Sequence, residues 1–423
     1  MSARKPRVAV VYNAPALPPD HRDAASESDV VEVAHAVAIA LEGQSFTPFL
    51  VAAKAPLQNF LEVLSLAKPD LVFNLIEGFN GISSGATHLT SLFELMGLPY
   101  TGSPVNALAA CVSKSRAKAL LRGFGLPVTN SIVIEREAPI AEALARSLPS
   151  LANGRLGGVE AQPSSAVDSD NQLSNIDDDS SSASDPAPPL PPPSQKGEKY
   201  PQIAWIGGCL LVKPDAEDGS LGIDQGSVVA DTKALVERVK YLRSLYDCGV
   251  IVEPYLPGPE FNLGVIALPE PRALAVAQIV FKPEIGRWPI LTYAAKWDEG
   301  SVADLASRPV CPALIDPAFA ERLSSLAVAA CRATGCRDYA RVDMRLDANG
   351  EPMILEVNPN PDIGPNAGWA RAARASGFSY EEAIGAIARE ALKRRRKSRE
   401  IAPSKTEWAA AVADKRKSDT RND

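Results

Sequence analysis

The sequence predicts an α/β protein, with a parallel sheet at its N-terminus and antiparallel strands further along the chain. Two observations carry this prediction. Up to about residue 105, short apolar strands alternate with amphipathic helices, a pattern typical of a mostly parallel sheet covered on both faces. In the stretch 339–361, two strand-like runs flank Asn349-Gly350, and this dipeptide is the strongest short signal for an antiparallel hairpin.

The N-terminal unit has three predicted strands. An apolar run at 7–13 is typical of a buried parallel strand, and a helical pattern at 29–44 separates it from a second strand at 46–53. The third strand lies in the stretch 70–81 and runs into a glycine-rich loop. A helix at 88–97 follows it.

The next unit opens with a basic amphipathic helix at 111–125 and a strand-like run at 126–134. Serine, aspartate and proline then dominate an insertion at about 150–200. We expect this insertion to be disordered, because it has few large apolar side chains to offset its ordering entropy. Its PPLPPP tract favours polyproline II and is suited to an aromatic groove, although a passive surface loop is the simpler interpretation.

Composition argues against several classes of protein. Hydrophobic residues make up 46% and charged residues 22% of the chain, which is ordinary for a globular protein. The net charge of −7 argues against general nucleic-acid binding, and no apolar run approaches the roughly 18–20 residues needed to span a membrane. The six cysteines lack zinc spacing, and the N-terminus lacks the pattern of a signal peptide. We therefore expect a cytoplasmic protein with reduced, mostly buried thiols.

The predicted hairpin opposes two carboxylates. With Asn349-Gly350 as a two-residue turn, residue 346 pairs with residue 353, and Asp343 stands directly across from Glu356. Like charges in that position are destabilising. Ile354 falls on the same polar face as the two acids, and the predicted apolar face holds Val342, Met344, Leu346, Met353, Leu355 and Val357.

Two interpretations of this carboxylate pair are open from the hairpin alone. The face is either solvated, with Arg341 and Arg345 neutralising the acids, or it is a cation site. A hard cation such as Mg²⁺ prefers carboxylate and amide oxygens, and Asn358 lies two residues after Glu356.

Four further features are candidates for holding a nucleotide. Lys213 ends an apolar strand, and the glycine-rich loop 218–222 after it can wrap backbone N–H groups around phosphates. Glu253 ends a strand and Glu260 opens another, so either can accept a hydrogen bond from an adenine amino group or a ribose hydroxyl. Lys296 lies in a polar loop beside a tryptophan. Each feature alone is also typical of an ordinary loop, and the chain has no P-loop or G-x-G-x-x-G motif.

Taken in order, these pieces resemble the ATP-grasp superfamily and, within it, the D-alanine–D-alanine ligases. The resemblance covers residues 70–365 without the insertion. It is carried by the helix of Lys114, V-K-P with its glycine-rich loop, V-E-P-Y with G-P-E, Y-A-A-K-W, C-P-A, and A-R-V-D-M with L-E-V-N-P.

The resemblance implies a domain organisation. An N-terminal α/β preATP-grasp domain at 1–107 precedes a two-subdomain ATP-grasp fold of α+β type. Its central subdomain spans 108–255 and includes the insertion. Its C-terminal subdomain spans 256–395 and carries the metal site, and a polar basic tail at 396–423 is expected to be disordered.

The resemblance also implies a role for each candidate residue. Asp343, Glu356 and Asn358 match the ligands of Mg²⁺ (or Mn²⁺). ATP phosphates are matched to Lys114 and Lys213, to the loop residues Gly219, Ser220 and Gly222, and to Lys296 at the γ-phosphate. Adenine and ribose are matched to Glu253 and Glu260, and the tetrahedral intermediate to Arg341.

The function implied is an ATP-dependent carboxylate–amine ligase that works through an acyl phosphate and releases ADP. D-alanyl-D-alanine formation for peptidoglycan and the joining of other amino acids or small carboxylates are both open as the reaction. A non-catalytic nucleotide-binding regulatory protein is the alternative from another class. Small-molecule substrates are expected as partners, with no nucleic acid and no membrane, and a homodimer is implied by the family.

The half of the chain that meets the amino acids departs from the family. Proline replaces glycine in the N-terminal loop, where Glu27 is the nearest acid, and the family's His-Gly is Glu77-Gly78 here. After Asn358 the chain continues through Asp362 to Gly364 instead of P-G-M. We therefore take Glu77, Asp362 and Gly364 as substrate candidates, and the two acids would suit a substrate with additional donors or a cationic group.

Overall fold

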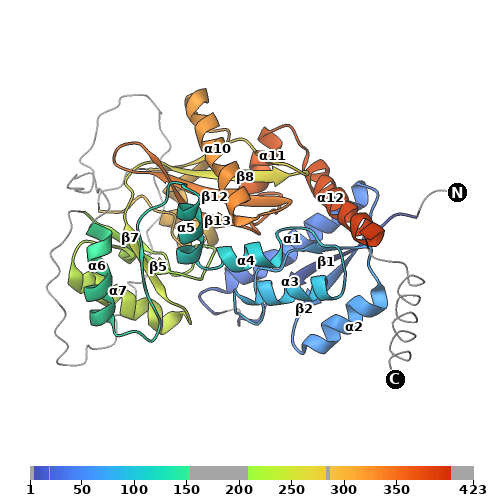
Figure 1. Ribbon diagram of the computed structural model, residues 1–423, viewed down its shortest axis with the longest axis horizontal. Coiled ribbons are helices and arrows are strands. Elements are labelled where there is room, and N and C mark those ends of the chain that lie inside the picture. The colour runs from blue at the N-terminus through green and yellow to red at the C-terminus, as the bar shows by residue number, and fades with distance from the viewer. Residues whose placement is uncertain (1–3, 19, 153–207, 283–285, 402–423) are drawn as a thin grey trace, which may run out of the picture.

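The computed structural model describes residues 4–18, 20–152, 208–282 and 286–401, which form three sheets with their helices (Figure 1). The predicted disordered insertion lies outside the described residues from residue 153 onward, and so does the predicted tail beyond residue 401. Within the described ranges, no helix is both long enough and apolar enough to cross a membrane.

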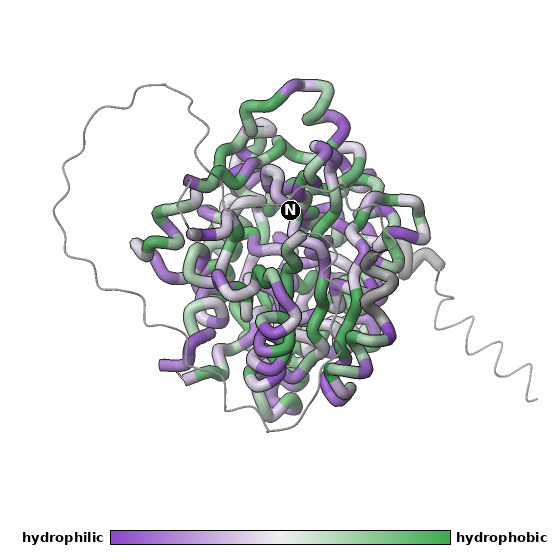
Figure 2. The backbone as a smooth tube through the Cα atoms, turned by 90° about the vertical axis from the view of Figure 1, so that its left-hand side faces the viewer, coloured by the Kyte–Doolittle hydropathy of each residue, from purple (hydrophilic) through white to green (hydrophobic). Residues whose placement is uncertain are grey.

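The N-terminal sheet is parallel, which confirms the prediction. Its strands lie in the order β2-β1-β3, with β1 at Arg7–Asn13, β2 at Thr47–Ala53 and β3 at Leu71–Asn74. Val8 and Val10 pack on α1 (Ala24–Gly43), whereas Ala9 and Val11 pack on α2 (Leu57–Ala67) and α3 (Gly85–Leu95). Both faces of the sheet are therefore covered by helices. Figure 2 shows hydrophobic stretches of the backbone, in green, inside the molecule.

The central part holds an antiparallel sheet in the order β4-β7-β5-β6. Two helices precede this sheet in the chain, α4 (Val105–Cys111) and α5 (Lys114–Gly123). Its strands are β4 (Ile132–Ile134), β5 (Leu210–Pro214), β6 (Val228–Val229) and β7 (Val250–Pro254). The helices α6 (Ile140–Ala152) and α7 (Thr232–Leu245) belong to the same part, with a short 3₁₀ turn at Gln225–Ser227 (Figure 1).

The C-terminal sheet is also antiparallel, in the order β11-β10-β8-β12-β13, with β9 paired to β8. Its strands are β8 (Glu260–Ala267), β9 (Pro271–Ala273), β10 (Ala277–Phe281), β11 (Ser307–Val310), β12 (Tyr339–Leu346) and β13 (Pro352–Asn358). Its helices are α8 (Ala294–Trp297), α9 (Val302–Leu305), α10 (Pro317–Thr334), α11 (Gly368–Ala375) and α12 (Tyr380–Ile401). Helix α12 thus continues into the first residues of the predicted tail.

The hairpin of β12 and β13 confirms part of the predicted pairing and corrects the rest. Asp343 does stand opposite Glu356, but a β-bulge after this pair places Met344 opposite Ile354 and Leu346 opposite Pro352. An extra residue in one strand inverts the facing of all the residues beyond it. Ile354 therefore joins Val342 and Met344 in the core, whereas Leu355, predicted to be apolar core, lines a cavity.

The predicted two-residue turn is also wrong. Asp347 accepts a hydrogen bond from the N–H of Gly350 at 3.1 Å, and its carboxylate accepts from the N–H groups of Asn349 and Glu351 at 2.8 Å each. Gly350 has a φ of 78°, whereas Asn349 is not among the residues with positive φ. Because a type I′ turn needs positive φ at both central residues, this loop is longer and depends on the Asp347 side chain.

A buried ion pair fastens α12 to the rest of the molecule. Asp338 is fully buried and accepts from both terminal nitrogens of Arg394, at 2.8 and 2.7 Å. Its carboxylate also accepts from the N–H of Gly102 at 2.9 Å, and Arg394 donates to the carbonyl of Tyr100. Helix α12 therefore holds the segment of Tyr100 and Gly102, which follows α3. This contact lies beside the core shared by α1 and α12.

We predict that Arg394→Met lowers the free energy of unfolding by about 3 kcal/mol, because it leaves the buried Asp338 carboxylate without its cation. This is the lower end of the usual cost, since Arg394 keeps 27% of its side chain exposed. Urea unfolding followed by circular dichroism measures the loss. Lys393→Met is the control, because Lys393 is exposed and, among the residues that the structure describes, pairs with Glu390 alone. Equal effects of the two variants would contradict the assignment.

Candidate active site

A cavity of about 540 Å³ is lined by residues from all three parts of the chain. Carboxylates, lysines and arginines enter it from strands of both antiparallel sheets, from α8 and from the loops that follow β3 and β13. It collects most of the residues predicted for the site, namely Glu77, Lys213, Gly219, Ser220, Glu253, Glu260, Lys296, Arg341, Asp343, Glu356, Asn358 and Asp362.

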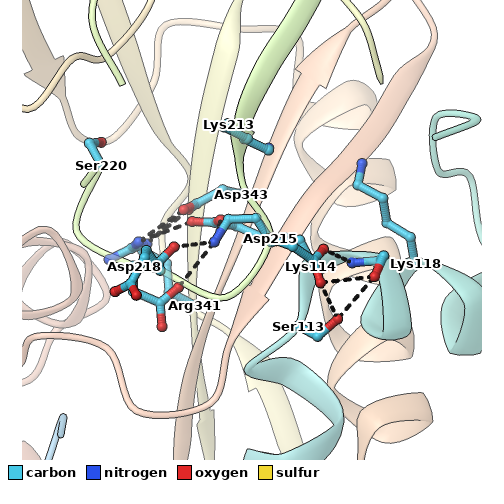
Figure 3. Close-up of polar contacts among 12 residues, drawn as sticks. Ser113, Lys114, Lys118, Lys213, Asp215, Asp218, Ser220, Arg341 and Asp343 are labelled. Atoms are coloured by element: carbon cyan, nitrogen blue, oxygen red, sulfur yellow. Dashed lines mark hydrogen bonds and ion pairs between the residues drawn. The ribbon is translucent and has the colours of Figure 1, made fainter. Parts of the chain in front are cut away.

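Three predicted residues are not among those that line the cavity: Lys114, Gly222 and Gly364. Lys114 does contact residues that line the cavity. Its Nζ lies 3.6 Å from a carboxylate oxygen of Glu356 and 3.5 Å from Asp218, and it donates to the carbonyl of Glu217 (Figure 3). Burial would lower the pKa of Lys114, but these acids outweigh burial and raise the pKa above its ordinary value.

The two glycines shape loops beside the cavity, and their contact with ligands stays a prediction. A Cβ on Gly222 would meet Tyr246 at 2.7 Å and Pro214 at 2.8 Å, and its φ of 68° favours glycine. The N–H of Gly364 donates to Asp362 at 2.7 Å, so this glycine orients a carboxylate of the cavity without facing the cavity itself.

The N-terminus of α5 is anchored beside the cavity by a residue that the motifs did not single out. Asp215 accepts from the Ser115 N–H at 2.8 Å and from the Ser113 hydroxyl at 2.6 Å, and its carbonyl accepts from the N–H of Lys114 (Figure 3). Since Asp215 follows β5, this contact holds Lys114 at a fixed distance from Lys213 at the end of the same strand.

The opposed carboxylates Asp343 and Glu356 are compensated by cations. Arg341 donates to both oxygens of Asp343, at 2.8 and 2.9 Å, and lies 4.0 Å from Glu356 (Figure 3). Burial would raise the pKa of Glu356, but Lys114, Lys213, Arg341 and Lys296 together lower it to about 2. The acids therefore stay ionised at neutral pH, and the repulsion expected from the hairpin alone is offset.

Oxygen donors for a hard cation are present on β13 and β12. Asp343 and Glu356 face each other across the strands, and the side-chain oxygen of Asn358 lies on the same strand as Glu356 and accepts from the N–H of Asn360 at 2.9 Å. This set of two carboxylates and an amide fits the chemistry of Mg²⁺. In the described ranges, no cluster of three or more His, Cys, Asp or Glu side chains has the arrangement of a metal site.

Glu253 lies between two buried lysines. One of its carboxylate oxygens is 2.7 Å from Lys213, and the other is 2.7 Å from Lys118. Burial would raise the pKa of Glu253, but the two lysines hold it well below its ordinary range. Each oxygen thus bonds one lysine, and the carboxylate, which also lines the cavity, has further acceptor sites for the predicted contact with adenine.

Arg345 lies 3.4 Å from Glu260. The solvated interpretation of the hairpin expects Arg345 to neutralise Asp343 and Glu356 instead. Arg345 also donates to the carbonyl of Pro289 at 2.7 Å and to the hydroxyl of Tyr255 at 3.2 Å. Burial raises the pKa of Glu260 in spite of Arg345. Arg345 engages one carboxylate oxygen of Glu260, Oε2, and the side chain lines the cavity.

Lys296 lies on the one-turn helix α8, not in the loop predicted for it. The neighbouring Trp297 indole donates to the carbonyl of Gly219 at 2.9 Å, and the Ser220 hydroxyl donates to the carbonyl of Leu291 at 3.0 Å. These bonds join the glycine-rich loop to the segment that carries Lys296, so the two form one part of the cavity wall.

One end of the cavity, where Asp29, Glu77 and Asp362 lie close enough to interact, is acidic. Desolvation by the surrounding protein, and then the carboxylates of Asp362 and Asp29, raise the pKa of Glu77 to about 8, although its side chain stays exposed to solvent in the cavity. Asn360 holds this end together, since it donates to the carbonyl of Ile76 at 2.9 Å. It also accepts from the hydroxyl of Tyr339 at 2.8 Å.

Several lining residues escaped the sequence analysis. Asp29 faces the cavity, whereas Glu27, the acid expected there, accepts from the N–H groups of Ala16 and Leu17 at 2.8 and 2.7 Å. Helical periodicity could have indicated Asp29 instead of Glu27, because two residues that are two positions apart on α1 point about 200° apart around the helix axis. Arg371 on α11 also lines the cavity and had no motif to mark it.

Comparisons with known proteins agree with this geometry. Residues 194–389 match the family model described as D-ala D-ala ligase C-terminus. Over 312 residues the chain is 26% identical to a D-alanine–D-alanine ligase of Haemophilus influenzae. This match covers 74% of this chain and 80% of that protein. It is 28% identical over 332 residues to the enzyme of the same name from Gluconobacter oxydans, which covers 78% of this chain and 84% of that protein.

The fold is similar to solved structures of the same class. The crystal structure of D-alanine–D-alanine ligase from Bacillus anthracis complexed with ATP superimposes with a TM-score of 0.61 at 15% identity, covering 93% of this chain and 99% of that one. Fold and site together define an ATP-dependent, ADP-forming ligase of the ATP-grasp class. Within that class, the chain is similar to the D-alanine–D-alanine ligases.

The lowered pKa of Glu356 leads to a prediction about acid stability. A carboxylate with a depressed pKa stabilises the fold above its unfolded value of about 4.5 and loses this contribution as the pH falls toward 2. We expect Glu356→Gln to be less stable than the unchanged protein by about 3 kcal/mol at pH 7, with the difference vanishing near pH 2.

Chemical denaturation across this pH range measures the difference. Glu351→Gln is the control, because Glu351 lies on the same hairpin with 55% of its side chain exposed and pairs only with Arg322. A stability gap for Glu356→Gln that is the same at every pH would rule out the proposed charge balance.

Proposed function

We propose that the protein joins a carboxylate to an amine through an acyl phosphate, with ATP converted to ADP and phosphate. A carboxylate is a poor electrophile, so transfer of the γ-phosphoryl group must activate it before the amine displaces phosphate. The first step brings two anions together and requires cations around the reacting groups. The observation that carries this proposal is the single cavity in which Lys213, Lys296 and Arg341 surround Asp343 and Glu356.

We propose that Asp343, Glu356 and Asn358 hold Mg²⁺ or Mn²⁺. When bound, such an ion neutralises the charge on the phosphate oxygens of ATP. The chain's own contribution is to keep both carboxylates ionised, which the surrounding lysines and Arg341 support.

Lys114 and Lys213 are assigned to the inner phosphates and Lys296 to the γ-phosphate. Lys296 lies at the part of the cavity wall formed by α8 and the Gly219–Ser220 loop, which supports a role in excluding water from the acyl phosphate. Arg341 is assigned to the oxyanion of the tetrahedral intermediate. Its guanidinium is held by Asp343, and a preoriented donor of this kind contributes about 3–4 kcal/mol to such a transition state.

We predict that Asp343→Asn and Glu356→Gln each reduce ADP release at least about a hundredfold, because each removes a ligand charge from the proposed metal site. A coupled assay of ADP release measures this loss, and Glu351→Gln, on the exposed end of the hairpin, should retain activity. A protein that binds ATP but releases no ADP with any amino acid would support the alternative, a nucleotide-binding regulatory protein. Unchanged turnover in the two variants would remove the metal assignment.

The acidic end of the cavity supports a substrate with an additional cationic group. Asp29, Glu77 and Asp362 line this end, and a bound cation would favour the ionised form of Glu77, whose pKa is raised to about 8. D-alanine itself carries one amino group and remains the second candidate. A cytoplasmic location and a homodimer, implied by the family, stay predictions.

We predict that cationic amino acids stimulate ADP release more than D-alanine does. Glu77→Gln should reduce kcat/KM for the best cationic substrate about tenfold, the effect of losing about 1.4 kcal/mol of binding, with the KM for ATP unchanged. A substrate panel in the ADP assay checks this, with Glu42→Gln, an exposed acid at the outer end of α1, as the control. A preference for D-alanine that Glu77→Gln leaves intact would contradict the cationic substrate.

A further inference from the structure

Lys118 is a buried charge that the proposed mechanism does not use. It lies on α5 one turn after Lys114, and 1% of its side chain is exposed. Its Nζ is 2.7 Å from a carboxylate oxygen of Glu253 and donates to the hydroxyl of Thr129 at 2.7 Å. A lysine is seldom fully buried without a partner, so this position depends on Glu253.

The same glutamate holds a lysine of the active site. The second carboxylate oxygen of Glu253 is 2.7 Å from the Nζ of Lys213, and the exposed fractions of these two side chains are 1% and 5%. Lys213 lines the cavity, whereas Lys118 is not among the lining residues. Figure 3 shows the two lysines on different elements, Lys118 on α5 and Lys213 on β5. The three groups form a row of charges, positive, negative and positive.

This arrangement has a consequence for the charge that a phosphate would meet. A lysine paired with a glutamate alone forms a neutral pair, which attracts an anion only as a dipole. Lys118 neutralises Glu253 from the side away from the cavity, so the row keeps a net charge of +1 at the end that faces the cavity. Low exposure makes this compensation effective, because water does not screen the three charges.

We propose that Lys118 is a positioning residue that acts through Glu253 to keep the positive charge of Lys213 available to the phosphates of ATP. The inference rests on the proposed function, in which Lys213 binds those phosphates. Glu253 then serves as the bridge between the two lysines.

Lys118→Met tests this proposal, since methionine keeps most of the volume and removes the charge. The Glu253–Lys213 pair stays intact in this variant, so folding should be retained, and a thermal melt checks this. Because the remaining pair is neutral, we expect the Kd for Mg·ATP to rise about tenfold or more, measured by calorimetry on the full chain without an acceptor substrate. Lys118→Gln makes the same charge change and replaces Lys118→Met if that variant is unstable.

The double variant K118M/E253Q separates this role from a purely structural one. It removes both charges and leaves Lys213 positive, so the Kd for Mg·ATP should return to within about threefold of the unchanged protein. If Lys118 only supports packing, the double variant will bind ATP no better than Lys118→Met, and the proposal is overturned. Lys233→Met, an exposed lysine on α7, is the control for loss of one positive charge and should bind as the unchanged protein does.

Lys213→Met distinguishes failure of this inference from failure of the proposed function. Loss of ATP binding in Lys213→Met, together with normal binding in Lys118→Met, would overturn the inference alone. Normal ATP binding in Lys213→Met, or no ATP binding by the unchanged protein, would overturn both.

Discussion

The rest of the site depends on the pairing of Asp343 with Glu356 across β12 and β13. Two carboxylates at opposed positions are unfavourable unless cations lie close to them. Arg341 bonds Asp343 directly, and Lys114 lies 3.6 Å from Glu356. Arg341 comes from β12 and Lys114 from α5, so the hairpin and α5 must meet at one place. The charge balance at the hairpin therefore joins the central and C-terminal parts of the chain.

Charge balance of the same kind recurs along the cavity. Lys213 is held by Glu253, which is itself held by Lys118, and Glu260 is held by Arg345. In a site of low exposure, an unpaired charge is costly, whereas a paired one keeps its position and protonation state. Such a network of paired charges suits phosphoryl transfer from a nucleotide to a carboxylate, because its cations are already in place when the anions enter.

The end of the cavity that would receive the amino acids is built differently. Asn360 ties the loop after β13 to the loop after β3, and these two loops carry Asp362 and Glu77. The proposed nucleotide end thus keeps the residues that match the family, whereas acids line the proposed substrate end of this chain. This division is consistent with a common activation step and a changed specificity, since phosphoryl transfer needs the same cations for any carboxylate.

Local pattern was sufficient to predict the parallel sheet, the β12–β13 hairpin and the opposition of Asp343 and Glu356, because periodicity and turn residues act over a few positions. Family motifs predicted twelve of the residues that line the cavity. The β-bulge after Asp343, the partner of Arg345 and the exclusion of Gly222 from the cavity could not be read in this way, since each depends on contacts between distant segments. Lys118 is the clearest case. On a basic amphipathic helix it is typical of a solvated face, and only the folded chain brings Glu253, 135 positions further along, within 2.7 Å of it.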